Sequence, residues 1–247
     1  LEAGYRGINL DVCNCGGVYQ FCHGLCSLGS RDINEVFTNI NTFMNDNPTE
    51  VVVITLQMNS NADQAVNLEE LYTFATAVPG FSEKFYQHTN VTDDWPTLRE
   101  VIGSNKRILA FHFAGQTCTD ATPCPPGLHY YLDYATNNPW QASTLADLRE
   151  TSVSCPLSST PGVAGKTFFG MNNFVTPPSQ TAARSANSLE FARNRLATCS
   201  SLNEGLDVNF VYVDFWYEGD LPQLTQEHNM ALANRRQRQI RKRRLAH

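Results

Sequence analysis

The sequence has no long hydrophobic run. Its longest apolar stretches, such as Val51 to Ile54, fall far short of the roughly 18 residues that a membrane-spanning helix needs. It also lacks the low hydrophobic content of a disordered chain, because hydrophobic residues make up 42% of its 247 positions. Neither an initiator Met nor a signal-peptide pattern stands at Leu1. We therefore expect a globular chain with one sizeable core, mature or truncated at its amino end.

Acidic residues are absent from positions 235–247, where seven residues are Lys or Arg. The whole chain has 18 basic and 24 acidic residues. Residues 1–234 therefore hold 11 of the basic residues and all 24 acidic residues. An acidic body argues against a nucleic acid as the partner. The basic stretch from Arg235 to Arg244 has two interpretations: a segment that contacts an anionic membrane surface, or a solvated helix end.

Cysteine, by contrast, is abundant. The even number and local clustering of the cysteines predict disulfide bonds, and hence a secreted or lumenal location. We expect Cys22 to pair with Cys26, and Cys118 with Cys124. One glycosylation sequon, Asn90-Val91-Thr92, is compatible with that location. The eight cysteines are Cys13, Cys15, Cys22, Cys26, Cys118, Cys124, Cys155 and Cys199.

A zinc site is the other interpretation of the first four cysteines. Cys13-x-Cys15 and Cys22-His23-x-x-Cys26 offer residue types that zinc binds. Their spacings depart from the usual Cys-x-x-Cys pairs. A count of free thiols separates the two interpretations, because disulfides leave none.

Strand and helix patterns alternate along the chain. This order predicts a parallel sheet with helical crossovers, an α/β fold. Residues 114–139 are rich in Thr, Pro and Asn and indicate a long loop with one short strand over 129–132. About six strands are visible, whereas a closed (β/α) barrel has eight. The main expected strands are 7–12, 18–23, 50–57, 107–113, 166–174 and 209–216, and the expected helices are 31–47, 68–77, 97–102, 144–151, 183–199 and one from 221 onward.

Polar residues stand at or near the carboxyl ends of several predicted strands, where parallel α/β folds gather active groups. They are Asp11, Gln57, His112 and Asp214, with His23 after the second strand. A buried carboxylate is costly unless it is paired, so two of them suggest a polar centre. Taken singly, each Asp is equally typical of a helix cap or a loop anchor, and His112 of a core histidine.

Six short segments, in a fixed order, carry a family resemblance. The first three are Gly4-Tyr5-Arg6-Gly7-Ile8-Asn9-Leu10-Asp11, Cys22-His23-Gly24, and Phe43 to Ile54 with Asn47-Pro48-Thr49-Glu50. The later three are Trp95-Pro96-Thr97-Leu98, Asn105-Lys106-Arg107-Ile108-Leu109 and Asn209-Phe210-Val211-Tyr212-Val213-Asp214-Phe215. Together they resemble the X region of phosphatidylinositol-specific phospholipase C, above all the X-domain-only phospholipase-C-like phosphodiesterases of plants, fungi and protists. The resemblance implies a distorted TIM-type (β/α) barrel.

The chemistry that this resemblance implies uses two histidines. One deprotonates the inositol 2-hydroxyl, which attacks phosphorus, and the other protonates the leaving oxygen of diacylglycerol. By resemblance His23 is the general acid, and Asp214 is the carboxylate that orients the first histidine in bacterial relatives. The first histidine belongs to a strand that would precede Leu1, so we expect an incomplete barrel that is inactive alone. His228-Asn229 matches the missing motif only as a dipeptide.

The charge-neutralising position of the family falls on Asp11. Bacterial relatives have Arg there, while calcium-dependent animal relatives have Asp, with Glu at the positions of Asn9 and Gln57. Calcium favours several carboxylates among its six to eight oxygen ligands, so Asn9, Asp11 and Gln57 would bind it weakly. These three residues are the expected phosphate or metal site, with Asp11 as the metal ligand.

The resemblance therefore implies a phosphoric diester hydrolase that is secreted or lumenal, and monomeric. Its partner would be a phospholipid or another inositol phosphodiester, with peripheral membrane contact through the basic stretch. The alternative is a non-catalytic binding module for inositol phosphates on the same barrel, which the amides of Asn9 and Gln57 favour. We expect the barrel over residues 1–224 and a carboxy-terminal helix with the basic tail over 225–247.

Overall fold

The computed structural model describes residues 1–58, 66–113, 118, 123–157 and 168–245. These residues form two compact units. The amino-terminal unit is Leu1–Ala135 within those limits, and the carboxy-terminal unit begins at Thr136.

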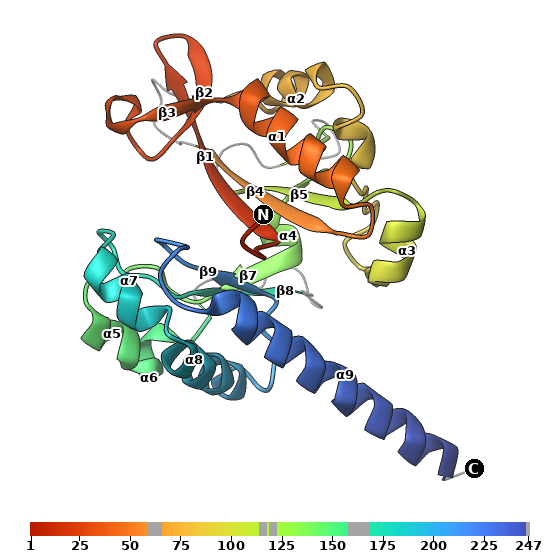
Figure 1. The fold of residues 1–247 in the computed structure, drawn as a ribbon, viewed down its shortest axis with the longest axis vertical. Helices are drawn as coiled ribbons and strands as arrows, with labels where there is room; N and C mark the ends of the chain where they lie inside the picture. The colour runs from red at the N-terminus through yellow and green to blue at the C-terminus, as the bar shows by residue number, and fades with distance from the viewer. Residues whose placement is uncertain (59–65, 114–117, 119–122, 158–167, 246–247) are drawn as a thin grey trace. The chain divides into compact units, whose positions relative to one another are not determined.

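A six-stranded sheet is the centre of the amino-terminal unit (Figure 1). Its order is β3-β2-β1-β4-β5-β6, in which β1, β4, β5 and β6 are parallel and the β1–β2–β3 segment is antiparallel. The alternation of parallel strands and helices confirms the predicted α/β class. The strands are β1 (Gly7–Cys15), β2 (Val18–Cys22), β3 (Ser30–Asp32), β4 (Val52–Met58), β5 (Ile108–Phe113) and β6 (Leu128–Tyr130).

Helix α1 (Ile33–Asp46) shows why the chain folds this way locally. The Asp32 side chain accepts a hydrogen bond from the N–H of Glu35 at 2.8 Å and caps the helix, and Pro48 follows its end. One face carries apolar residues at helical spacing, and these are buried in the same core as the residues of β4. Helix α1 lies beside α2 (Leu68–Ala77) in Figure 1. The other helices of this unit are α3 (Leu98–Gly103), α4 (Tyr131–Tyr134), η1 (Cys26–Leu28) and η3 (Ser82–Lys84).

The two faces of this sheet differ in chemistry because successive side chains of a strand point to opposite sides. Ile54 and Leu56 of β4 face the apolar core, while Thr55 and Gln57 face the other way. Directly paired residues of neighbouring strands share a face. The face of Gln57 therefore also carries Asp11, its partner on β1.

The carboxy-terminal unit has a three-stranded sheet in the order β7-β8-β9. The helix predicted over 183–199 is two helices, α7 and α8, because Asn187 and Ser188 occupy the end of one and the start of the next. Both residue types favour caps over helix interiors. The elements are β7 (Ala135–Asn137), β8 (Phe168–Asn172), β9 (Phe210–Tyr212), α5 (Leu145–Arg149), α6 (Thr151–Ser154), α7 (Gln180–Ala186), α8 (Leu189–Leu202) and α9 (Leu221–Leu245).

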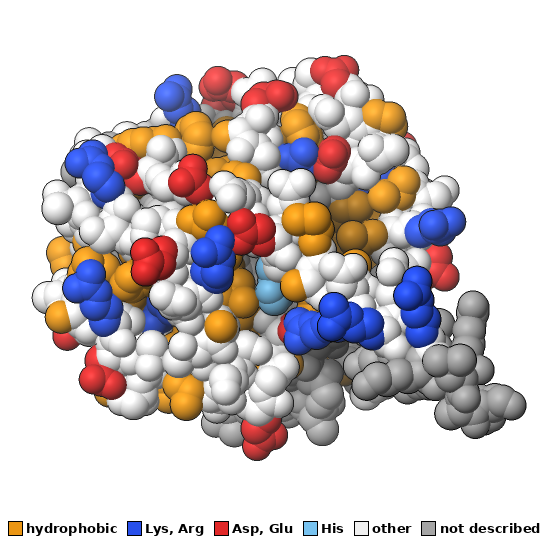
Figure 2. Space-filling model, turned by 60° about the horizontal axis from the view of Figure 1, so that its bottom comes forward, with side chains coloured by type: hydrophobic (Ala, Val, Ile, Leu, Met, Phe, Trp, Pro, Cys, Tyr) orange, Lys and Arg blue, Asp and Glu red, His pale blue; other side chains and the backbone are white. Residues whose placement is uncertain are grey.

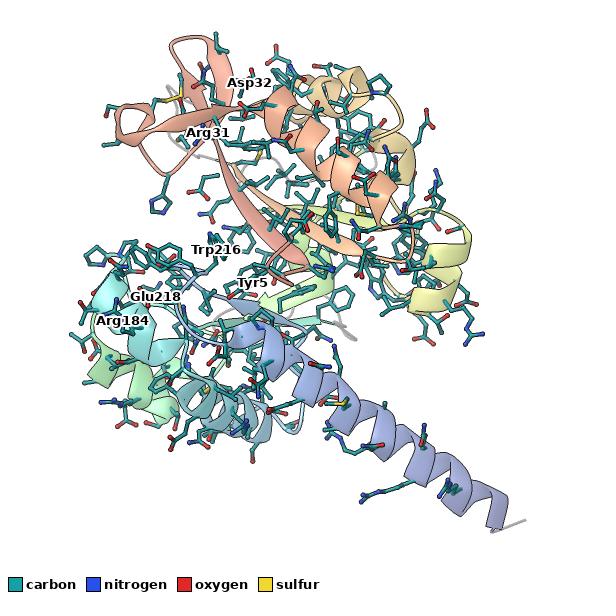
Figure 3. All side chains as sticks on the ribbon, in the orientation of Figure 1. Tyr5, Arg31, Asp32, Arg184, Trp216 and Glu218 are labelled. Carbon is teal, nitrogen blue, oxygen red and sulfur yellow. A yellow bond between two sulfur atoms is a disulfide. The ribbon has the colours of Figure 1, made fainter. Side chains whose placement is uncertain are left out.

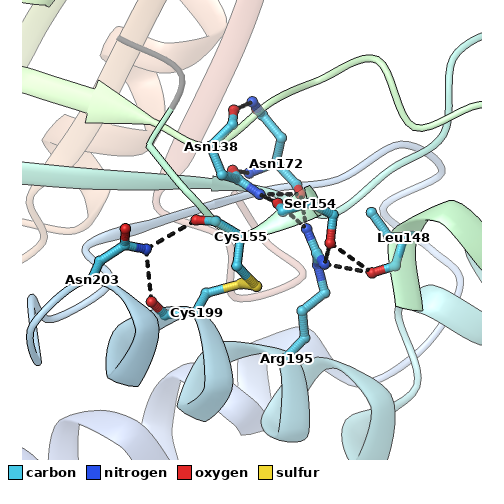
Figure 4. Close-up of a disulfide and its surroundings, with 8 residues drawn as sticks. All are labelled: Asn138, Leu148, Ser154, Cys155, Asn172, Arg195, Cys199 and Asn203. Carbon is cyan, nitrogen blue, oxygen red and sulfur yellow. Dashed lines mark hydrogen bonds between the residues drawn. A yellow bond between two sulfur atoms is a disulfide. The ribbon is translucent and has the colours of Figure 1, made fainter. Parts of the chain in front are cut away.

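A buried arginine of α8 forms hydrogen bonds with three other elements of this unit (Figure 4). Arg195 of α8 is 3% exposed, and its guanidinium donates to the carbonyls of Leu148, Ser154 and Asn172 at 2.6–3.1 Å. Burial lowers its pKa to about 10. One turn further along α8, Cys199 forms a disulfide with Cys155. The guanidinium and the disulfide thus fix the same face of α8 to α5, α6 and β8.

Four disulfides join all eight cysteines, which confirms the disulfide prediction and contradicts the zinc interpretation. The expected pair Cys118–Cys124 is correct. The expected pair Cys22–Cys26 is wrong, because Cys22 bonds to Cys13 and Cys26 bonds to Cys15. The β1–β2 hairpin pairs Val12 with Phe21, which places the cysteines of one strand beside those of the returning chain.

The described strands form these two sheets, and the hydrogen bonds between them close neither sheet into a barrel. Strand β9 ends at Tyr212, earlier than the predicted strand over 209–216. Among the described helices, none combines the length and apolar character needed to cross a membrane.

His129 of β6 is a buried polar group that the sequence did not single out. Its Nε2 accepts a hydrogen bond from the N–H of His88 at 2.9 Å, so the ring is neutral and its Nδ1–H donates to the carbonyl of Ala110 at 3.0 Å. Burial lowers the pKa of His129 from 6.5 to about 4. The ring therefore contributes to stability only while it is uncharged.

This pKa predicts a specific loss of stability in mild acid. Above pH 6.5 His129 is neutral in both the folded and the unfolded chain. Between pH 6.5 and 4 the unfolded chain binds a proton that the folded chain excludes, so the free energy of unfolding falls, by about 3 kcal/mol in full. Urea unfolding of wild type and His129→Gln from pH 7 to 4 should show a shallower slope in the variant. Parallel curves would contradict this assignment.

Candidate active site

Asp11, Asn9 and Gln57 lie together at the carboxyl end of the parallel strands β1 and β4. Asp11 pairs directly with Gln57, and Asn9 pairs with Thr55 two residues earlier. The three polar side chains therefore share the sheet face opposite the apolar core. Asn9 and Gln57 are exposed, and Asp11 is half-buried. The structure thus brings together the three residues of the predicted phosphate site.

His23 joins this group from the returning strand. Strand β2 runs antiparallel to β1 and pairs Phe21 with Val12, so the chain at His23 passes back beside the Asp11 end of that pairing. Burial raises the pKa of Asp11, and the charge of His23 acts in the opposite direction. That interaction shows that the imidazole and the carboxylate lie within electrostatic reach of each other.

The segment that carries His23 is fixed by covalent bonds on both sides. Cys22 bonds to Cys13, and Cys26 bonds to Cys15. Between them the N–H of Leu25 donates to the His23 carbonyl at 2.9 Å, in a turn that Gly24 enters with φ of 75°. Glycine adopts this left-handed conformation without strain. The exposed imidazole therefore has a constrained backbone.

His112 lies outside this site. It pairs with Leu56 and so belongs to the face opposite Gln57. The side chain is completely buried, and its Nε2 lies 3.4 Å and 3.5 Å from the sulfurs of Cys118 and Cys124. The interpretation of His112 as a core histidine is confirmed.

Asp214 belongs to the carboxy-terminal unit, in the loop after β9. Its carbonyl accepts a hydrogen bond from the buried Asn187 amide at 3.0 Å. Gly219 in the same loop has φ of 86°, and a Cβ there would overlap the backbone of Asn187. An ion pair between Arg184 and Glu218, at 3.1 Å, holds the far end of the loop (Figure 3). Close packing against Asn187 thus fixes the backbone at Asp214, and its role in orienting a histidine stays a prediction.

Among the described histidines, His23 is the exposed one. His88 and His129 are buried beside Trp95, with the His88 ring stacked on the indole at 4.4 Å. His228 is half-buried on α9, and burial lowers its pKa.

Charged side chains of both signs are interspersed on the face shown in Figure 2.

The described residues do not fit a resident calcium ion at Asp11. Calcium takes six to eight oxygens and favours carboxylates, whereas Asp11 has the amides of Asn9 and Gln57 as its neighbours. The groups of three possible ligand residues among the described positions consist of cysteine with cysteine or histidine, and those cysteines are disulfide-bonded.

Comparison with known proteins identifies the family of this chain. The family model described as PI-PLC X 1 matches residues 1–229. The chain belongs to the PI-PLC X domain family. This X domain is 29% identical over 101 residues to "PI-PLC X domain-containing protein 1" of Arthroderma benhamiae, and 29% identical over 115 residues to an "Uncharacterized secreted protein" of the same fungus. These matches cover 40% and 45% of the chain, and span 32% and 25% of the two relatives.

A solved structure supports the same fold. The X domain resembles a phosphatidylinositol-specific phospholipase C from Staphylococcus aureus with a TM-score of 0.51 and 14% identity. The match covers 86% of this chain and 74% of that protein. The likeness confirms the predicted α/β fold class of distorted, incomplete TIM type, although the described strands do not close a barrel.

The raised pKa of Asp11 predicts that the site costs stability. The pKa of Asp11 in the folded chain is higher than its ordinary value of 3.8, so the folded chain holds the proton more tightly than the unfolded chain does. The free energy of unfolding is therefore highest below pH 3.8, and it falls as the pH rises through the folded pKa. Asp11→Asn should therefore raise the free energy of unfolding at pH 7, as measured by the urea midpoint.

Asp32→Asn is the matched control, because it removes one carboxylate at an exposed helix cap where Asn serves as well as Asp. It should leave the midpoint nearly unchanged. A loss of stability in Asp11→Asn at pH 7 would show that the carboxylate is a net structural support.

Proposed function

We propose that this X domain is a phosphoric diester hydrolase that cleaves a phosphatidylinositol-type phosphodiester by acid–base chemistry. The observation that carries the proposal is the register of the β1–β2 hairpin, which brings the chain at the exposed His23 back toward the half-buried Asp11 at the carboxyl edge of the sheet. Membership of the PI-PLC X domain family supports it.

In this proposal a sugar hydroxyl attacks phosphorus, and the bond from phosphorus to the lipid oxygen breaks. His23 donates its proton to that leaving oxygen. Asp11 provides negative charge beside the imidazole, and the exposed amides of Asn9 and Gln57 provide neutral donors for the phosphoryl oxygens.

The proposed reaction also needs a general base that takes the proton of the attacking hydroxyl. His129 is engaged at both ring nitrogens, and His88 and His112 are buried. The described residues of the amino-terminal unit therefore include an exposed histidine for the role of general acid, and no second exposed histidine for the role of general base. On this proposal turnover by the chain alone is low.

The proposed location is secreted or lumenal, with phospholipid as the substrate class. Four disulfides persist where the environment is oxidising. Likeness to a fungal protein described as secreted supports the same location.

The acid role of His23 predicts a dependence on the leaving group. His23→Ala should slow cleavage of an inositol phosphodiester with a lipid alkoxide leaving group by about 100- to 10,000-fold. Cleavage of the matching nitrophenyl ester should slow far less, because nitrophenolate leaves without a proton. Initial rates on both substrates test this, with His228→Gln as the histidine control that keeps both activities.

Equal losses on the two substrates would show that His23 binds the substrate and does not protonate the leaving group. The second candidate function is a non-catalytic inositol-phosphate module, which the neutral amides of Asn9 and Gln57 favour. Calorimetry that detects inositol phosphate binding by a wild type without turnover on either ester would support this candidate over hydrolysis.

We also propose an anionic membrane surface as the partner of the basic stretch on α9. Arg238 and Arg241 are exposed on this helix, and Arg235 is exposed although it pairs with Asp207 at 3.1 Å. Each arginine near an anionic surface contributes about 1 kcal/mol, an attraction that salt weakens.

Replacing both Arg238 and Arg241 with Gln should therefore reduce binding to vesicles that contain anionic lipid by roughly 30-fold at low salt. Sedimentation with neutral and anionic vesicles measures this. Arg31→Gln with Arg99→Gln removes the same charge elsewhere and should bind as wild type. Equal binding by all three proteins would exclude an electrostatic role of α9.

A further inference from the structure

The sequon Asn90-Val91-Thr92 has no part in the proposed chemistry. It lies in the connection between η3 and α3 of the amino-terminal unit. It is the single Asn-x-Ser/Thr triplet of the chain in which the middle residue is not proline. Asn47-Pro48-Thr49 has the same spacing but carries proline, which excludes it as an acceptor.

The folded turn joins the two functional groups of this triplet. The Oδ1 atom of Asn90 accepts hydrogen bonds from the Thr92 hydroxyl at 2.9 Å and from the Thr92 N–H at 3.2 Å. Both side chains are exposed. Asn47, by contrast, is half-buried, and its amide donates to the carbonyl of Phe43 at the end of α1.

We infer that Asn90 is an N-glycosylation site. The co-substrate is an oligosaccharide linked through pyrophosphate to a polyprenyl lipid. The Asn90 nitrogen forms a bond to the anomeric carbon of the sugar, and the bond from that carbon to the pyrophosphate oxygen breaks. One amide hydrogen leaves as a proton, the lipid pyrophosphate is the leaving group, and no oxidation occurs.

The hydrogen bonds of the turn leave a hydrogen of the Asn90 amide available for replacement. The amide nitrogen of Asn90 has two hydrogens, and one of them donates to Oδ1 of Asp93 at 3.1 Å. Glycosylation replaces one of these hydrogens and leaves the Oδ1 atom able to accept both bonds from Thr92. The Asn–Thr part of the turn is therefore compatible with an attached glycan.

The base of the loop is rigid on both sides of the sequon. His88 is buried, stacks on Trp95 at 4.4 Å and places its Nε2 at 3.1 Å from the carbonyl of Asp93. The chain between these anchors therefore projects Asn90 and Thr92 into solvent from a fixed support.

The disulfides of the chain indicate the same cellular compartment as N-glycosylation does. The four disulfides require an oxidising environment, and in eukaryotic cells such an environment is where N-glycans are transferred to secreted chains. The inference does not rest on the proposed hydrolase activity, so failure of either leaves the other intact.

The test is expression of the full chain behind a cleavable secretion signal in a eukaryotic host. Intact mass and peptide mapping before and after peptide-N-glycosidase treatment measure occupancy of Asn90. Wild type and Thr92→Ser should carry a glycan, whereas Asn90→Gln and Thr92→Ala should carry none. The Asn47 peptide of every sample should be unmodified and serves as the internal control.

An unmodified Asn90 peptide in secreted, disulfide-bonded wild type would overturn the inference. A glycan that persists in Asn90→Gln would also overturn it. Translation of the same four chains into microsomes reads the modification before folding is complete. A mobility shift of wild type that Asn90→Gln and Thr92→Ala abolish supports the site even where a variant is not secreted, and the absence of a shift in wild type overturns it.

Discussion

The two disulfides of the β1–β2 hairpin are the constraint on which the candidate site depends. The antiparallel strands β1, β2 and β3 form one end of the sheet, and a hairpin of short strands has little stability of its own in water. Cys13–Cys22 and Cys15–Cys26 fix the returning chain to β1 on either side of His23. Because β1 also pairs in parallel with β4, the same constraint sets His23 relative to Asp11 and Gln57. Covalent bonds therefore perform here what a larger apolar core would do elsewhere.

The site combines this rigidity with an unfavourable charge. Asp11 is withdrawn from water far enough to raise its pKa, and the charge that offsets this belongs to the exposed His23. The opposite face of the sheet packs on an apolar core with α1 and α2, and the burial of that core offsets the free-energy cost of the partly buried carboxylate. The carboxy-terminal unit shows the same division, since Arg195 and the Cys155–Cys199 disulfide support the unit in which Asn187 fixes the backbone at Asp214.

Periodicity was sufficient to locate most elements, because a helix or a central strand needs an apolar pattern of its own. The helix over 68–77 and the strand that contains Ile54 are examples. Helix ends were harder to predict than helices. The Asn187-Ser188 pair divides one predicted helix into two, and the spacing of apolar residues does not reveal this because both residues are polar. Strand β9 ends at Tyr212, and Asn187 donates to the carbonyl of Asp214 just after it, a contact between segments distant in sequence that no local pattern predicts.

The sequence by itself determined the α/β class, the PI-PLC X likeness, the presence of disulfides and the strand-end position of Asp11, because these depend on composition and local pattern. Only the tertiary structure decided which cysteines pair, since hairpin register sets the distance between sulfurs. It also decided that His112 points into the core while Gln57 joins Asp11, because the face of a strand residue depends on register with its neighbours. The approach of His23 to Asp11 likewise required the folded hairpin, since strand pairing and not chain order brings the two segments together.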